Sequence, residues 1–134
     1  MQFIIKTINH SLNKAYLKEK VKRIDFDRFK FSFDVFVSKI NENESEEQLK
    51  YPLRDFLKGT FYQEYEINTK GRTDLAIYSG TDTKAPVSVI FETKKPGSRE
   101  FPDSNKPDTL NCKALHEVIL YYLNERDVEN NNDL

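Results

Sequence analysis

The chain has 134 residues, of which 37% are hydrophobic and 13% aromatic, and this is enough for one domain with a modest core. The 21 basic and 22 acidic residues nearly cancel, so composition provides no general attraction to nucleic acid, and any such binding requires a local basic patch. The single cysteine excludes an intramolecular disulfide and a cysteine-based zinc site, and neither a membrane span nor a signal peptide is evident, so we expect a cytoplasmic protein without membrane contact.

The first 40 residues are predicted to form a helical segment that packs on the core. Residues 11–21 have a weak helical pattern, and a stronger pattern follows in which large apolar side chains fall on one helix face. These side chains are Phe26, Phe29, Phe33, Phe36, Val37 and Ile40. We interpret this second helix as structural.

Another amphipathic helix is predicted to begin after Ser45, because the stretch SEEQ at residues 45–48 matches a capping box ahead of an apolar stripe. Pro52 lies inside this helix and is expected to kink it or to mark a restart, since proline has no amide hydrogen. Helical phase places Glu46 on the side of the apolar stripe, whereas Glu47 is rotated by roughly 100°. Glu46 is therefore better aimed at a sheet beneath the helix. Either glutamate would also stabilise the helix through its interaction with the helix dipole.

After Gly59 the pattern changes from helical to strand-like. Strands are predicted over residues 61–67 and 72–78, with a turn between them, and a third strand begins at Val87 after the turn SGTDTKAP. The order of helices and strands predicts an α/β domain with a mixed central sheet flanked by helices.

A last helix is predicted beyond a polar segment that runs to about Pro107. Asp108 or Thr109 can cap this helix, whose apolar stripe comprises Leu115, Val118, Ile119 and Tyr122. Residues 127–134 are predicted to form a disordered tail.

Charged residues end the third strand, in the stretch VIFETKKPG. Side chains alternate along a strand, so Glu92 and Lys94 share one face, while Phe91 and Thr93 share the other. If the second and third strands pair as a hairpin, Asp74 can lie across from Glu92. The hairpin would then bring two carboxylates and one amine to a single point.

Such a cluster predicts a divalent metal site at Asp74 and Glu92. Mg²⁺ keeps several waters and takes only one or two protein carboxylates, and Mn²⁺ is an alternative ion. The ammonium group of Lys94 can orient a water or stabilise negative charge that develops on a phosphate. This combination fits metal-dependent hydrolysis of a phosphodiester.

The order of these features is similar to that of the PD-(D/E)XK nuclease superfamily, with Asp74, Glu92 and Lys94 matching its motif. Three stretches more closely resemble the N-terminal cleavage module of large type IIG-like restriction-modification enzymes, which fuse nuclease, adenine methyltransferase and specificity regions in one polypeptide. These stretches are NENESEEQLKYPLRDFLKGTFYQEYEINTKGRTDLAIY, FETKKPG and LNCKALHEVILYYLNER. The resemblance covers residues 41–126, and Thr73 stands where the superfamily motif has proline.

This resemblance implies a restriction-endonuclease-like nuclease core over residues 41–126, truncated at its C-terminal end. It implies a type II site-specific deoxyribonuclease that cleaves double-stranded DNA with Mg²⁺ held by Asp74 and Glu92. Lys94 would position the attacking water, and Glu46 or Glu47 would be an outer metal ligand. The methyltransferase and specificity regions of the same full-length polypeptide would be its partners, and the chain alone would have little activity.

Six basic residues are candidates for contacts with DNA phosphates, although each could equally serve only to keep the surface soluble. They are Lys70, Arg72, Lys95, Arg99, Lys106 and Lys113. For Lys113, an i,i+4 salt bridge with Glu117 is as good an account as a role at the site.

Two other functional classes remain open. A catalytically inactive module could keep the nuclease fold and bind DNA or a partner domain, and a plain interaction domain would leave the carboxylates without a function. Three short strands also leave unpaired sheet edges, which predict a weak homodimer.

Overall fold

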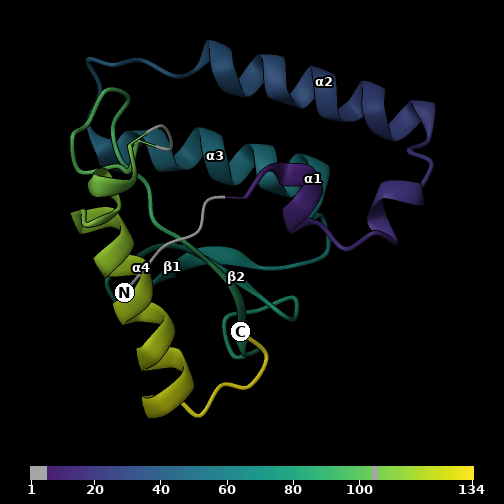
Figure 1. Cartoon of the computed structure of the whole chain (residues 1–134). Helices are drawn as coiled ribbons and strands as arrows, with labels where there is room; N and C mark the ends of the chain where they lie inside the picture. The colour runs from purple at the N-terminus through teal and green to yellow at the C-terminus, as the bar shows by residue number, and fades with distance from the viewer. Residues whose placement is uncertain (1–5, 104–105) are drawn as a thin grey trace.

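The computed structural model describes residues 6–103 and 106–134 and has an α/β architecture, as the sequence predicts. Helix α3 lies between the sheet and helix α2, while α4 stands at one side of the sheet (Figure 1). The helices and strands are α1 (Ile8–Ser11), α2 (Arg23–Ser38), α3 (Glu46–Thr60), β1 (Ile67–Lys70), β2 (Thr73–Tyr78), β3 (Val87–Phe91) and α4 (Lys113–Leu123). Shorter helical turns are η1 (Tyr16–Lys18), η2 (Pro107–Leu110) and the π-helical η3 (Asn124–Val128).

The sheet has the order β1-β2-β3, and its two strand pairs are antiparallel. The mixed sheet that the sequence predicts is therefore not found among the described residues. Antiparallel pairing follows from the short connections, because a hairpin joins neighbouring strands directly whereas parallel strands need a longer crossover.

One face of the sheet forms the main core with α3. Its buried side chains are Leu57, Ile67, Leu75 and Ile77. The opposite face buries Ala76, Tyr78 and Val87, against which Leu134 packs. Because side chains of β2 are buried on both faces, this central strand is a rigid support for a site at its end.

The predicted position of the first strand, residues 61–67, is wrong except at its last residue, because β1 covers Ile67–Lys70 and so occupies most of the stretch predicted to be a turn. After α3 the chain turns twice, since the amide of Tyr62 donates to the carbonyl of Leu57 and the amide of Tyr65 donates to that of Tyr62. The hairpin turn is centred on Gly71, whose φ of +59° favours glycine.

Helix α3 begins as the capping box predicts. The amide of Gln48 donates to the Ser45 hydroxyl, and the amide of Ser45 donates to the Gln48 side chain. The helix continues through Pro52 as one element, so the restart that proline could have caused does not occur.

Helix α2 packs against α3 through aromatic rings, as its apolar stripe predicts. The rings of Phe29, Phe33 and Phe36 have centroids 5.4–6.1 Å from that of Phe56. By contrast, residues 11–21 contain only the end of α1 and the three-residue η1 in place of the predicted helix. Tyr16 is 70% exposed, and a short helix without a buried face has little to stabilise it.

The C-terminal residues are ordered in place of the predicted disorder. Asn131 is 7% exposed, and its Nδ2 donates to the carbonyl of Val87 at 2.7 Å and to Glu125 Oε2 at 3.2 Å. Lys70 pairs with the other oxygen of Glu125 at 2.6 Å. These contacts give buried polar groups partners, which a count of polar residues in the tail does not reveal.

Helix α4 begins at Lys113, later than predicted, and the residue before it makes no capping hydrogen bond through its side chain. The Thr109 hydroxyl donates to the carbonyls of Lys106 and Asp103 instead, and the side chain of Asp108 lies outside the described part of the structure. Within residues 6–103 and 106–134, no helix has the length and apolar character needed to cross a membrane.

Candidate functional site

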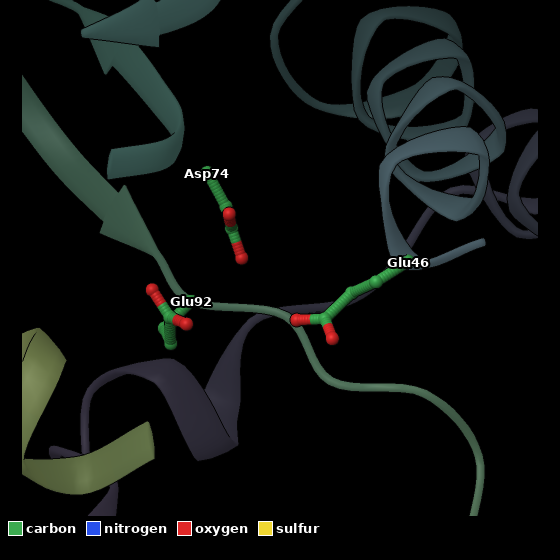
Figure 2. A group of neighbouring side chains, drawn as sticks. All are labelled: Glu46, Asp74 and Glu92. Atoms are coloured by element: carbon green, nitrogen blue, oxygen red, sulfur yellow. The ribbon is translucent and has the colours of Figure 1, made fainter. Parts of the chain in front are cut away.

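Three carboxylates from separate elements meet at the open end of the β2–β3 hairpin, opposite its turn. Glu46 is the first residue of α3, Asp74 lies in β2, and Glu92 directly follows β3 (Figure 2). Each offers one oxygen, and these oxygens lie within 4.8 Å of one another. This spacing allows one cation to contact all three carboxylates.

Strand register explains how the hairpin contributes two of these groups. Leu75 pairs with Phe91, so the next residues outward, Asp74 and Glu92, are neighbours where the ladder ends. The Ser45 cap fixes the start of α3, and thus Glu46, beside them. The predicted approach of Asp74 to Glu92 is confirmed.

Lys94 lies among the carboxylates with a side chain that is only 5% exposed. Its Nζ pairs with Glu92 Oε1, with Glu117 Oε2 at 3.0 Å and with Glu46 Oε1 at 3.4 Å. Burial lowers the pKa of Lys94, but these carboxylates raise it more, and the net pKa lies above the ordinary lysine value. Lys94 is therefore an ammonium ion at neutral pH.

Glu92 has one oxygen that lacks a hydrogen-bond donor among the described residues. Its side chain is 4% exposed, and Oε2 faces no described donor, while the Glu117 carboxyl lies in hydrogen-bonding reach of the Glu92 carboxyl. Burial, the charge of Asp74 and this contact together outweigh Lys94 and raise the pKa of Glu92 to about 7. Glu92 therefore takes up a proton at a higher pH than an ordinary glutamate does.

Asp74 is held through both of its oxygens. Oδ2 accepts hydrogen bonds from the amide and the hydroxyl of Thr93, each at 2.8 Å, and Oδ1 pairs with Lys50 Nζ at 2.8 Å. Burial raises the pKa of Asp74, but these bonds lower it more, and the net pKa lies below the ordinary aspartate value. Asp74 is consequently ionised and fixed in orientation.

Of the two glutamates at the start of α3, Glu46 belongs to the carboxylate cluster and Glu47 does not. Glu46 contributes an oxygen to the cluster, whereas Glu47 is 65% exposed and reaches it only through Lys50, at 2.6 Å. Lys50 follows Glu46 by four residues, a spacing that places both on one helix face and could have identified this lysine from the sequence. Glu117 joins the cluster from α4, and only its pairing with Lys113 was foreseen.

The six candidate DNA contacts fall into two groups. Three have carboxylate partners: Lys70 pairs with Glu125, Lys106 with Asp103 at 3.4 Å, and Lys113 with Glu100 and Glu117 at 3.5 and 3.9 Å. The other three, Arg72, Lys95 and Arg99, are exposed and form no ion pair with any residue in the described ranges.

A pocket of about 490 Å³ lies on the α4 side of the site. Lys70, Arg72, Tyr121 and Glu125 contribute to its wall. Tyr121 lines this pocket, and burial together with the charges of the nearby site carboxylates raises its pKa.

The donor set of the cluster is suited to a hard divalent cation. It contains carboxylate oxygens and no sulfur or imidazole, and such ligands favour Mg²⁺, Mn²⁺ or Ca²⁺ over zinc. The buried oxygen of Glu92 that lacks a described donor is a second feature that a cation would satisfy.

Comparison with known proteins gives one family. A family model described as a domain of unknown function (DUF7149) matches residues 6–134 of the chain. No curated protein and no solved structure matches it. The matched range contains every residue of the carboxylate cluster together with α2 and the C-terminal tail.

Proposed function

The chain belongs to the DUF7149 family of domains of unknown function, and we propose that it is a magnesium-dependent nuclease module that hydrolyses phosphodiester bonds in double-stranded DNA. In this proposal the fold is a restriction-endonuclease-like core of the PD-(D/E)XK type. The meeting of Asp74, Glu92 and Lys94 at one hairpin end, in the order and spacing of the nuclease motif, is the observation that carries the proposal.

The residues present are suited to the proposed metal. Asp74 and Glu92 would hold the ion, and Glu46 would be the further carboxylate on its α3 side. When bound, a divalent ion supplies positive charge to the scissile phosphate and makes a water molecule easier to deprotonate.

The surrounding side chains prepare the site for this chemistry. Thr93 keeps Asp74 aimed at the cluster, and Glu117 helps to hold the Lys94 ammonium in place. From that position Lys94 would orient the attacking water and stabilise charge on the phosphate. Asp74 itself lies on β2, a strand buried on both faces, which fixes its position better than a loop would.

The same proposal implies binding partners for this module. Arg72, Lys95 and Arg99 are the proposed phosphate contacts, because they are exposed and have no carboxylate partner in the part of the chain that the structure describes, which leaves them available to DNA. The resemblance to fused restriction-modification enzymes supports methyltransferase and specificity regions in the same polypeptide as further partners. A weak homodimer through an unpaired sheet edge also stays a prediction.

The proposal is tested with supercoiled plasmid DNA. We expect Mg²⁺-dependent nicking or linearisation by a polypeptide that carries this module with methyltransferase and specificity regions, weak cleavage by the 134-residue chain, and none with EDTA in place of Mg²⁺. Cleavage that persists at full rate in EDTA, or its absence from both proteins at every Mg²⁺ concentration, would count against a metal-dependent nuclease.

The alternative function is a module that binds DNA or a partner domain without cleaving. One observation favours it: the ammonium groups of Lys50 and Lys94 already contact all three site carboxylates, which stabilises them without a metal. Plasmid binding in a mobility-shift assay, without cleavage and without Mn²⁺ binding in calorimetry, would support this alternative.

The raised pKa of Glu92 predicts that metal affinity depends on pH. A metal requires the ionised carboxylate, so a proton competes with it below about pH 7, whereas Asp74 is already ionised there. We expect the Mn²⁺ association constant to fall by up to about tenfold for each pH unit below about 7, and to level off above it. Calorimetric titrations at a series of pH values measure this, and an affinity that is constant across the series would contradict it.

A further inference from the structure

Lys50 reaches into the carboxylate cluster from α3, although it has no place in the nuclease motif. Its side chain is 14% exposed, and its Nζ lies 2.8 Å from Asp74 Oδ1 and 2.6 Å from Glu47 Oε2. Burial lowers the pKa of Lys50, but the bonds to the two carboxylates raise it more, so the side chain is a cation. A fixed positive charge therefore stands against one of the proposed metal ligands.

This charge is not needed to orient Asp74. Thr93 already holds Oδ2 through its amide and its hydroxyl, each at 2.8 Å, and these bonds are independent of Lys50. The contribution that remains for Lys50 is electrostatic: it compensates the negative charge of Asp74 where the carboxylate is 12% exposed and poorly hydrated.

We propose that Lys50 is a built-in counter-ion with which a divalent cation must compete for Asp74, so that Lys50 limits the metal affinity of the site. This inference rests on the proposed metal centre. Like charges a few ångströms apart repel strongly where water is partly excluded, and Lys50 cannot move far because it is largely enclosed.

The test compares Mn²⁺ binding by two variants in calorimetry. Lys50→Met removes the charge but keeps an unbranched side chain, and we expect Mn²⁺ to bind on the order of tenfold more tightly than to the wild type. Lys39→Met is the matched control, because within the described residues Lys39 forms only an exposed pair, with Asp55 at 3.9 Å, and its loss changes net charge equally. The control should bind Mn²⁺ within about twofold of the wild type, since exposed charges are screened.

A second pair of variants separates charge from packing. Lys50→Arg retains the cation and should bind Mn²⁺ about as the wild type does. Lys50→Gln removes the charge and should show the same gain in Mn²⁺ affinity as Lys50→Met. If Lys50→Met does not fold, Lys50→Gln takes its place in the test. Circular dichroism establishes that each variant is folded.

Equal or weaker Mn²⁺ binding by folded Lys50→Met or Lys50→Gln would overturn the counter-ion role and leave the metal centre standing. Absence of Mn²⁺ binding from the wild type and from both variants would instead overturn the metal centre, and the counter-ion role with it.

Discussion

Asp74→Asn is expected to reduce Mn²⁺ affinity by about 100-fold or more and to abolish DNA cleavage. The substitution keeps the size of the side chain but removes its charge. Thr93 occupies one oxygen with two donors, so the new amide NH₂ group would be directed toward the Lys50 ammonium, where it has nothing to accept its hydrogens. Calorimetry with Mn²⁺ and the plasmid assay measure the two effects.

Asp55→Asn is the control for this variant. Asp55 is 55% exposed and, among the residues that the structure describes, pairs only with Arg54 and Lys39, at 3.5 and 3.9 Å. The same change of side chain there should therefore leave Mn²⁺ binding and cleavage at wild-type levels. Equal heats of Mn²⁺ binding in Asp74→Asn and the wild type would show that Asp74 is not a metal ligand.

Lys94→Met is expected to abolish cleavage and also to destabilise the metal-free protein by about 3–5 kcal/mol. The side chain is only 5% exposed, and its removal leaves Glu46, Glu92 and Glu117 without the ammonium that joins them. Mn²⁺ should restore part of the lost stability, because it brings positive charge to the same carboxylates. Urea unfolding in EDTA and in Mn²⁺ measures the stability, and plasmid nicking measures the activity.

Lys95→Met provides a closely matched control, since Lys95 is the next residue along the chain but is exposed and has no ion pair within the described residues. It should retain stability, with at most a reduced affinity for DNA. In a polypeptide that carries a methyltransferase region, methyl transfer should persist in both variants. Wild-type cleavage and stability in Lys94→Met would make Lys94 a surface charge without a role.

The centre of the candidate site was predictable because it depends on local geometry. Alternation along strands and the short β2–β3 connection suffice to bring Asp74 and Glu92 together, and Lys94 follows at the strand end. Helical phase also favours Glu46 over Glu47, and the structure places Glu46 in the cluster. Each of these inferences uses residues that are close in sequence or joined by a hairpin.

The rest of the site depends on where the chain goes after a regular element ends. Strand alternation predicts that Thr93 faces away from Glu92, but β3 ends at Phe91, and beyond it the chain is free to turn Thr93 toward Asp74. Glu117 reaches the cluster through the packing of α4, which no spacing in the sequence encodes.

At both ends of the chain the sequence pattern alone was a poor guide: a predicted helix is absent near the N-terminus, and the tail predicted to be disordered makes buried contacts. A weak helical pattern in residues 11–21 lacks a surface to pack against, so propensity alone does not form the helix. A polar tail suggests disorder, yet Asn131 has buried partners in Val87 and Glu125 that order it. In both segments tertiary contacts decide the outcome.

Thr93, the middle residue of the Glu-x-Lys motif, has a structural role, because it orients Asp74. Its hydroxyl and amide both donate to Asp74, so serine preserves the arrangement, valine removes one donor, and proline removes the hydroxyl and the amide hydrogen together. The orientation of the carboxylate at position 74 therefore depends on the residue at position 93, which lies just beyond the neighbouring strand of the hairpin.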